Sequence, residues 1–423
     1  MLDIKTFRER EVDVRKALEI RGATADIGGI LDLDRRRRAL LVEVETLKGA
    51  RNCVSKEISV LRKNGHDSSL QEVEMQATGD RVRLLDEQLA TIEDGIEKLM
   101  LDVPNMPHSA VPVGHGEDGD RIVRVIGERV KFNFEPLSHM DLSERLGIID
   151  FPRGTRMAGP GFPLFVGQGA RLERALVQFM LDLHTREHGY TEMSPPFLCN
   201  EAALTGTGQL PGLADEMYRT VDGLYLVPTA EVPLTNYYRN EIIPRQLPVC
   251  FAAYTPCFRR EAGAAGAETR GLLRVHQFDK VELVKFVEPS TSYTELEKLT
   301  ADAEDVLKRL GLHYRVIELC ASNLSLAAAK CYDIEVWSPA RNGWLEVSSC
   351  SNYEAFQARR AGIRYRRADG KPEFVHTLNG SGVALARLVV ALLEHYQTAD
   401  GSVTVPEVIV GYMDGKKTLN PEH

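Results

Sequence analysis

The sequence predicts an α+β protein in which an antiparallel helical coiled-coil arm precedes a domain built on an antiparallel sheet. Two patterns favour this class. Near the N-terminus, apolar residues recur at alternating spacings of four and three, which is typical of a coiled-coil seam. Later in the chain, strand-like runs alternate with a few amphipathic helical segments. With 423 residues, 43% of them hydrophobic, the chain is long enough for two or three domains with buried cores.

The predicted arm contains two apolar seams. The first runs through positions 40, 44, 47, 51, 54, 58 and 61, where Arg51 is the polar interruption, and the second runs from 75 to 99. The polar, glycine-containing stretch at 63–69 predicts a tight reversal between them. A helix over about 30–62 would be on the order of 50 Å long, too long for the interior of a compact domain. We therefore expect a projecting antiparallel hairpin.

Charge is distributed unevenly along this arm. Residues 35–63 contain nine Lys and Arg against three Asp and Glu, a net charge of +6, whereas residues 70–100 contain three against eight, a net charge of −5. A basic projecting helix suits contact with a phosphate backbone, although the whole chain has a net charge of −9. The same pattern fits a solvated first helix whose cations pair with the acidic second helix. The arm alone leaves both interpretations open.

The density of turn-forming residues predicts the domain boundaries. We expect the helical arm at 1–105, with its coiled coil at about 30–100, a Pro- and Gly-rich linker at 106–130, and a second domain at 131–423. In that domain, amphipathic helices are predicted at 170–188, 293–310 and 381–396. Strand-like runs are predicted at 221–227, 249–258, 274–287, 314–319, 333–337 and 344–349.

The composition argues against a membrane or secreted protein. No apolar run approaches the roughly 18 residues that a membrane helix needs, and the first ten residues carry too much charge for a signal peptide. The seven cysteines lie far apart and never as C-x-x-C, which indicates neither a zinc site nor a disulfide framework. We expect a cytoplasmic protein with reduced, mostly buried thiols and no membrane contact.

The hairpin around residue 258 carries charge where a strand rarely does. Apolar residues at strand spacing flank a glycine-containing loop, and Arg259 and Glu261 occupy positions i and i+2, which would share one face of a strand. A guanidinium there can clamp a phosphate or a carboxylate in two-point geometry, and a glutamate can orient it. An ordinary ion pair on a solvated face is the competing interpretation.

Other segments favour the functional interpretation. A helix and extended segment ending at Pro195, the hairpin at 258–278 and residues 380–387 at the start of a helix occur in this order, with Thr-Ala-Glu at 229–231 between the first two. These segments resemble motifs 1, 2 and 3 of the class II aminoacyl-tRNA synthetases. With the tripeptide and the long arm, the chain is similar to bacterial-type seryl-tRNA synthetases over essentially its whole length. The resemblance implies a class II catalytic core.

The resemblance also implies a reaction. Serine would attack the α-phosphate of ATP to form seryl-adenylate, and serine tRNA, bound through the arm, would accept the seryl group. Selenocysteine tRNA is a possible second acceptor. The resemblance implies that Arg259, Glu261 and Arg387 are catalytic residues. It also implies that ATP is bound by Arg259, Arg260, Glu261, Val275, Phe278, Glu346, Val347, Ser348, Ser349 and Arg387.

Within that set, the resemblance divides the work by chemistry. Arg259 would neutralise charge that develops at the α-phosphate, while Phe278 and Arg387 would enclose the adenine. Glu346 and Ser349 offer hard oxygen ligands for a Mg²⁺ ion that bridges phosphates. Motif 3 departs from the usual pattern at Ala386, where a glycine is more common.

Serine recognition is implied for five residues: Thr229, Ala230, Glu231, Glu282 and Ser381. A pocket that pairs a hydroxyl disfavours alanine, because its own polar groups would stay unpaired, and threonine would be refused by lack of room. Motif 1 resembles a dimer interface, so we expect a homodimer. The alternatives are a paralogue that activates a small amino acid for a carrier protein and a non-catalytic tRNA binder.

Overall fold

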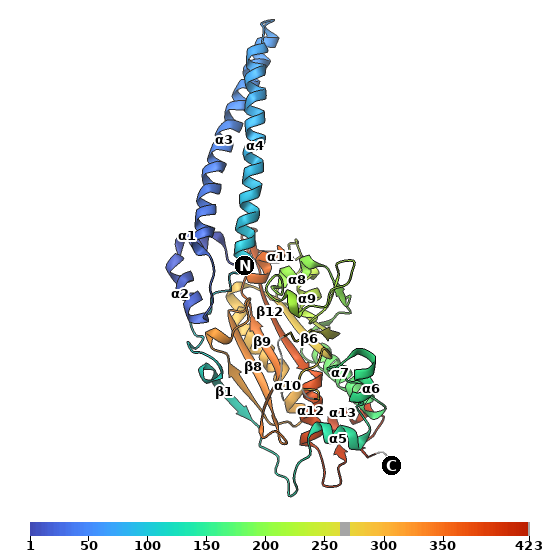
Figure 1. Ribbon diagram of the computed structural model, residues 1–423. Helices are drawn as coiled ribbons and strands as arrows, with labels where there is room; N and C mark the ends of the chain where they lie inside the picture. Colours follow the sequence, from blue (N-terminus) through green and yellow to red (C-terminus); the bar gives the residue numbers. More distant parts are fainter. Residues whose placement is uncertain (263–270, 422–423) are drawn as a thin grey trace. The chain divides into compact units, whose positions relative to one another are not determined.

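The computed structural model describes residues 1–262 and 271–421 (Figure 1). The chain divides into two compact units, one of residues 2–104 and one formed by residues 105–423 together with Met1. The first unit is helical, and the second combines an antiparallel sheet with helices. The predicted α+β class with its N-terminal coiled coil is therefore confirmed.

The N-terminal unit consists of two short helices and a long helical hairpin. These are α1 (Ile4–Glu9), α2 (Glu11–Arg21), α3 (Ile27–Lys63) and α4 (Ser69–Leu101). The hairpin buries apolar residues of both predicted seams against each other, namely Val44, Ile58, Val82, Leu85, Ile92 and Ile96. The reversal lies where the polar stretch at 63–69 predicts it.

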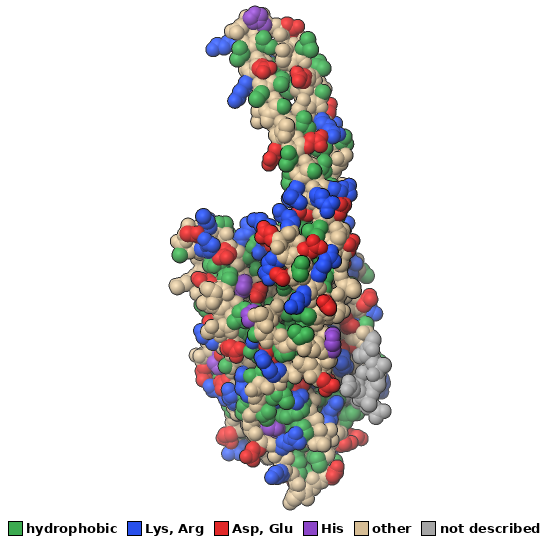
Figure 2. All heavy atoms as spheres, turned by 90° about the vertical axis from the view of Figure 1, so that its left-hand side faces the viewer, with side chains coloured by type: hydrophobic (Ala, Val, Ile, Leu, Met, Phe, Trp, Pro, Cys, Tyr) green, Lys and Arg blue, Asp and Glu red, His purple; other side chains and the backbone are tan. Residues whose placement is uncertain are grey.

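Ion pairs also join the two long helices. Arg37 pairs with Glu93 at 2.8 Å and Lys48 with Asp86 at 3.4 Å. In the opposite direction, Arg81 of α4 pairs with Glu43 of α3 at 2.8 Å. Figure 2 shows acidic and basic side chains interspersed along the hairpin. Part of the basic charge of α3 is thus already matched by α4, as one of the two interpretations of the sequence requires.

The C-terminal unit is built on an eight-stranded sheet in the order β1-β7-β8-β9-β12-β6-β5-β2. Neighbouring strands are antiparallel except for β2 and β5, which run parallel. The strands are β1 (Arg121–Ile126), β7 (Tyr314–Glu318), β8 (Lys330–Ser338), β9 (Gly343–Asn352), β12 (His376–Ala384), β6 (Gln277–Val287), β5 (Val249–Phe258) and β2 (Thr191–Glu192). Strands β2, β5, β6 and β12 are neighbours in the sheet although β2 and β12 lie far from the other two in sequence. The three predicted motifs therefore lie side by side.

The remaining elements connect or cover this sheet. The helices are α5 (His139–Leu146), α6 (Phe151–Ala158), α7 (Gln168–Arg186), α8 (Glu201–Thr207), α9 (Glu231–Thr235), α10 (Ser292–Arg309), α11 (Phe356–Ala361), α12 (Leu385–His395) and α13 (Glu407–Val410). Three two-stranded ribbons pair β3 (Leu198–Cys199) with β4 (Tyr225–Leu226), β10 (Arg364–Arg366) with β11 (Pro372–Phe374), and β13 (Val403–Thr404) with β14 (Thr418–Leu419).

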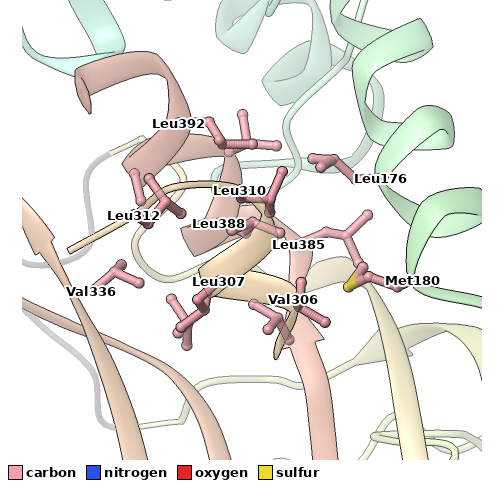
Figure 3. Packing of buried hydrophobic residues seen from close by; sticks show 14 of the residues in the cluster. Leu176, Met180, Val306, Leu307, Leu310, Leu312, Val336, Leu385, Leu388 and Leu392 are labelled. Carbon is pink, nitrogen blue, oxygen red and sulfur yellow. The ribbon is translucent and has the colours of Figure 1, made fainter. Parts of the chain in front are cut away.

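The main core lies between the sheet and three helices. Leucines of α12 pack among Leu307 and Leu310 at the end of α10 and face Leu176 and Met180 of α7 (Figure 3). On α7, apolar residues at helical spacing are fully or almost fully buried, which is the amphipathic pattern that the sequence displays. This core fixes the position of α12, whose first turn reaches the functional cleft.

Two sequence predictions require correction. The segment at 106–130 was expected to be a linker, but residues 121–126 form β1, the edge strand that pairs with β7. The Pro and Gly residues around it masked a short strand whose arginines pair with buried acids, as Arg124 does with Glu304. The segment at 381–396 was expected to be helical, but its first residues continue β12 and the helix begins at Leu385.

All seven cysteines are free thiols. Cys53 is exposed on α3, Cys250 is half-buried, and the others are buried. Within the described ranges, none of the helices has the length and apolar character needed to cross a bilayer.

Candidate active site

A cleft of about 950 Å³ opens over the strands that carry the predicted motifs. The structure brings thirteen of the predicted residues together along its walls: Thr229, Glu231, Arg259, Glu261, Val275, Phe278, Glu282, Glu346, Val347, Ser348, Ser349, Ser381 and Arg387. Ala230 and Arg260 do not line it. Ala230 is fully buried at the start of α9, and the side chain of Arg260 is exposed.

One end of the cleft is closed by two buried carboxylates, which we call the carboxylate end. The register of β12 on β6 places Ser381 opposite Glu282. Thr229 Oγ1 donates a hydrogen bond of 2.8 Å to Glu282 Oε2 and accepts one of 3.2 Å from the backbone N–H of Glu231. Lys280 pairs with the same Glu282 carboxylate. Glu282 is thereby fixed by Thr229, from the segment before α9, and by Lys280 on its own strand.

Glu231 is the second carboxylate, at the first position of α9. Gln357 donates a 2.6 Å hydrogen bond to its Oε1, and Gln209 lies 3.5 Å from its Oε2. Burial, followed by the negative charge of Glu282, raises the pKa of Glu231 to about 7. A cation bound near these two carboxylates would offset both the cost of burying the Glu231 charge and its repulsion by Glu282. This end of the cleft is therefore suited to an ammonium group.

A β-bulge places Ser381 at the cleft. The register of β12 against β6 shifts between Ser381 and Val383, and Val383 adopts a φ of 133°. Ser348 Oγ donates a 2.6 Å hydrogen bond to the Ser381 carbonyl. Two residues after Val383 the chain begins α12, which carries Arg387. The bulge therefore sets both the serine at one end of the cleft and the arginine at the other.

The opposite end of the cleft, which we call the arginine end, is formed by cations held on backbone carbonyls. Arg259 follows the last residue of β5, its Nε lies 3.4 Å from the Pro228 carbonyl, and its guanidinium lies 5.3 Å from the centre of the Phe278 ring. Arg387 donates to the Glu346 carbonyl at 2.8 Å and to the Leu273 carbonyl at 3.3 Å. Arg387 also lies 3.6 Å from the Glu346 carboxylate. The guanidinium N–H groups that these contacts do not use can bind a phosphate or a base.

The prediction that Arg259 and Glu261 share one face of a strand is wrong. Strand β5 ends at Phe258, and Glu261 lies beyond it with a φ of 49°, so Arg259 and Glu261 do not share a strand face. Glu261 pairs instead with Arg274 at 3.2 Å, across the entrance and exit of the β5–β6 connection. Most of that connection, residues 263–270, lies outside the described residues. Glu261 still lines the cleft.

A group of oxygen donors lies on β8 and β9. Ser349 Oγ donates to Asp333 Oδ1 at 2.6 Å and lies 3.4 Å from Glu346 Oε1. Burial and the neighbouring charge of Glu346 raise the pKa of Asp333 above its usual range. Across the ranges that the structure describes, no three acidic, histidine or cysteine side chains form a metal cage. The donors present fit a Mg²⁺ that takes its remaining ligands from phosphates and water.

Sequence reasoning missed several residues of the cleft. Gln209, Lys280 and Asp333 line the cleft, and Asp333 reaches it through the register of β8 on β9. Gln357 does not line the cleft but, like Gln209, binds Glu231 from a position more than twenty residues away in sequence. Lys280 lies two residues before Glu282, so strand alternation alone could have placed both on one face. No local pattern marks the two glutamines.

Comparison with known proteins agrees with this geometry. Residues 216–396 match the family model described as "tRNA synthetase class II core domain (G, H, P, S and T)", which defines the class of the catalytic unit. Residues 1–107 match the "Seryl-tRNA synthetase N-terminal domain". The chain belongs to the seryl-tRNA synthetase family. It is a ligase that attaches serine to tRNA.

Individual relatives match over their whole length. Serine–tRNA ligase of Carboxydothermus hydrogenoformans is 54% identical, with 98% of each chain covered. The enzyme of Geobacter sulfurreducens is 52% identical over 99% of this chain and 100% of its own. The crystal structure of seryl-tRNA synthetase from Pyrococcus horikoshii complexed with ATP superposes with a TM-score of 0.92 at 35% identity, covering 100% of both chains.

Proposed function

We propose that this cleft activates serine with ATP and then transfers it to tRNA through a seryl-adenylate intermediate. The observation that carries the proposal is the polarity of the cleft, with the buried Glu231 and Glu282 at one end and Arg259 and Arg387 at the other. An amino acid with its ammonium on the carboxylates directs its own carboxylate toward the arginines. The relative from Pyrococcus horikoshii, crystallised with ATP, supports ATP as the partner at the arginine end.

In the first step, a carboxylate oxygen of serine attacks the α-phosphorus, and pyrophosphate leaves. Arg259 holds a fixed positive charge where negative charge develops, and its position on the Pro228 carbonyl means that little reorganisation is needed. Phe278 and Arg387 enclose the base. The role of Glu261 in this proposal is to hold the Arg274 side chain at the mouth of the cleft.

Glu346 and Ser349 would hold a Mg²⁺ ion in this step. When bound, the ion supplies charge neutralisation at the phosphates. Ser349 is prepared for that role because Asp333 fixes its hydroxyl. Val347 and Ser348 of the same strand, together with Val275, provide the surface against which the nucleotide lies. Arg260 and Ala230 do not line the cleft, and they contribute only by holding their neighbours Arg259 and Glu231, which do line it.

Serine identity is assigned to the carboxylate end. Thr229 and Glu282 are already hydrogen-bonded to each other, and Ser381 lies opposite Glu282. A substrate hydroxyl can join this network, whereas alanine would leave its donors and acceptors buried without a partner.

In the second step, the terminal hydroxyl of tRNA attacks the seryl carbonyl and AMP leaves. We assign tRNA binding to the arm, residues 1–105, and catalysis to the unit that follows it. On α3, exposed Arg36, Arg51, Lys56 and Lys63 have no acidic partner within 4.0 Å among the described residues, in contrast to Arg37 and Lys48. These four cations are available to phosphates.

Serine-dependent exchange of pyrophosphate into ATP, with transfer to tRNA measured separately, tests the two steps. Exchange without charging of serine tRNA would contradict the proposal, and so would the absence of exchange.

Selenocysteine tRNA is proposed as a second acceptor in the same transfer assay. Sedimentation tests the proposed homodimer, which motif 1, from α7 to Pro195, would form. We place the reaction in the cytoplasm, where tRNA is charged.

A matched pair of arm variants tests the tRNA surface. The variant R51Q/K56Q/K63Q removes three cations without acidic partners, and R37Q/K48Q/R62Q removes three that are paired within the arm. Both change the net charge equally. We expect the first to raise the KM for tRNA about tenfold more than the second, with exchange unchanged in both. Equal effects would show that overall charge, not this surface, governs tRNA binding.

A further inference from the structure

The chain segment that precedes β6 forms part of the cleft without being part of the sheet. Leu272, Leu273, Arg274 and Val275 line the cleft, and β6 begins only at Gln277. Leu272 is fully buried, so its backbone amide requires an acceptor. The position of this segment determines where one wall of the arginine end lies.

His139 supplies that acceptor. The Leu272 N–H donates to His139 Nε2 at 3.3 Å, and the imidazole itself is almost completely buried. Because Nε2 accepts, Nδ1 carries the proton and donates to Glu394 Oε1 at 3.2 Å. The backbone N–H of His139 also donates to this oxygen, at 3.1 Å. A neutral histidine in one tautomer therefore joins the segment to a buried carboxylate.

Glu394 belongs to α12, the helix that also carries Arg387. Its side chain is fully buried, and its second oxygen accepts a hydrogen bond from Ser338. Arg387 and Glu394 are seven residues apart, two helical turns, and so lie on the same side of α12. Arg387 binds the Leu273 carbonyl directly, while Glu394 reaches the Leu272 amide through His139. One helix thus holds two consecutive residues of the segment.

Gly271 makes the approach of His139 possible. It adopts a φ of +67°, and a Cβ atom at this position would lie 2.2 Å from His139 Nε2. Such a contact is impossible without displacing the imidazole. The glycine therefore serves both the left-handed backbone and the close approach of the ring to the neighbouring amide.

We propose that His139 is a positioning residue for ATP binding, which acts by tying the segment at 271–275 to α12. His139 does not line the cleft. The inference rests on the proposed function only in naming ATP as the ligand of the arginine end. Loss of its acceptor releases the wall that carries Val275 and the carbonyl that anchors Arg387. The carboxylate end, held by other contacts, is unaffected.

Two substitutions separate the two nitrogens of the ring. In His139→Gln, the side-chain amide reaches the place of Nε2 and can still accept from Leu272. In His139→Asn, the amide reaches only the place of Nδ1, so the bond to Glu394 is retained and the Leu272 amide is left unpaired. The ATP Kd is measured by titration calorimetry, which needs no turnover, and the KM values for ATP and serine are measured in the exchange assay.

We expect His139→Asn to raise the Kd and KM for ATP about tenfold, because a buried amide loses its acceptor. The Gln variant should stay within about threefold of the wild type, and the KM for serine should be unchanged in both. Equal effects of Asn and Gln would overturn the proposal. If the KM values for ATP and serine rose together and Tm fell, His139 would have a structural role only, and the proposal would be wrong.

Ser143→Ala is the matched control on α5. Ser143 is fully buried and bonds the His139 carbonyl at 2.5 Å without touching the imidazole. The Ser143→Ala variant should lower Tm and leave the ATP Kd unchanged.

If the Asn variant does not fold, Glu394→Gln is the second test, because it keeps the side-chain volume but removes the charge that fixes the tautomer of His139. We expect a smaller rise of the ATP Kd in this variant, and no rise would contradict the proposal. Failure of wild-type exchange with normal ATP binding would count against the proposed function alone.

Discussion

The two ends of the cleft are built by different means. At the carboxylate end, buried side chains bind one another: Thr229 to Glu282, and Gln357 to Glu231. At the arginine end, half-buried arginines donate mainly to backbone carbonyls, and Arg387 also pairs with the Glu346 carboxylate at 3.6 Å. A side-chain network fails as a unit when one member is lost, because its partners become unpaired. Groups held by the backbone can be removed one at a time.

The largest expected effect tests the arginine end. Arg259→Ala should lower kcat in the exchange assay by about 10³-fold, because a fixed charge at the reacting phosphate is lost. The KM for serine should stay within about twofold, since no contact of Arg259 reaches Glu231 or Glu282. Steady-state exchange at varied serine and ATP gives all three constants. A large rise in the KM for serine would show that the two ends are coupled.

The next effect tests the carboxylate end. Glu231→Gln keeps the shape and the contact with Gln357 but removes the charge that an ammonium requires, so the KM for serine should rise about 100-fold. The KM for ATP should not change. Gln357→Glu is not a suitable control because it adds charge; Arg260→Gln, whose side chain is exposed outside the cleft, is the matched surface change. A rise in the KM for ATP would break the division between the two ends.

The two ends should also differ in their response to pH. Burial and Glu282 raise the pKa of Glu231 to about 7, and only the ionised carboxylate attracts an ammonium. The KM for serine should therefore rise about tenfold as the pH falls from 8 to 6, whereas the KM for ATP should show no such rise. Exchange kinetics at fixed ionic strength measure this. Glu231→Gln should abolish the dependence, and a dependence that survives this substitution would assign the titration to another group.

The smallest effect separates packing from charge at the arginine end. Phe278 lies beside the Arg259 guanidinium and lines the cleft. Phe278→Ala should raise the KM for ATP about tenfold by loss of stacking, with kcat reduced far less than in Arg259→Ala. Phe278→Tyr retains the ring and should bind ATP normally. Loss of kcat in Phe278→Ala comparable to that in Arg259→Ala would mean that the ring positions the arginine rather than the base.

These ends were not equally predictable from the sequence. Arg259, Arg387, Glu346 and Thr229 lie in local segments that resemble motifs of the family, and that resemblance is what indicates them in the sequence. Gln357, which binds Glu231 without lining the cleft, and Asp333, which the register of β8 on β9 brings to the cleft, have no such signal. The seams of the arm were predictable from periodicity alone. The prediction failed at β1, where turn residues surround a short edge strand, and at Glu261, where strand alternation was extended past the end of β5.

The distribution of thiols has a practical consequence. Cys53 lies exposed on α3 between Arg51 and Lys56, whereas burial raises the pKa of the half-buried Cys250 to about 11 and keeps that thiol protonated. A maleimide fluorophore at neutral pH should therefore attach to one position on the helical hairpin and leave the cleft untouched. The native chain thus carries its own site for spectroscopy, and a change in the polarisation of such a dye on addition of tRNA would test the proposed role of the arm.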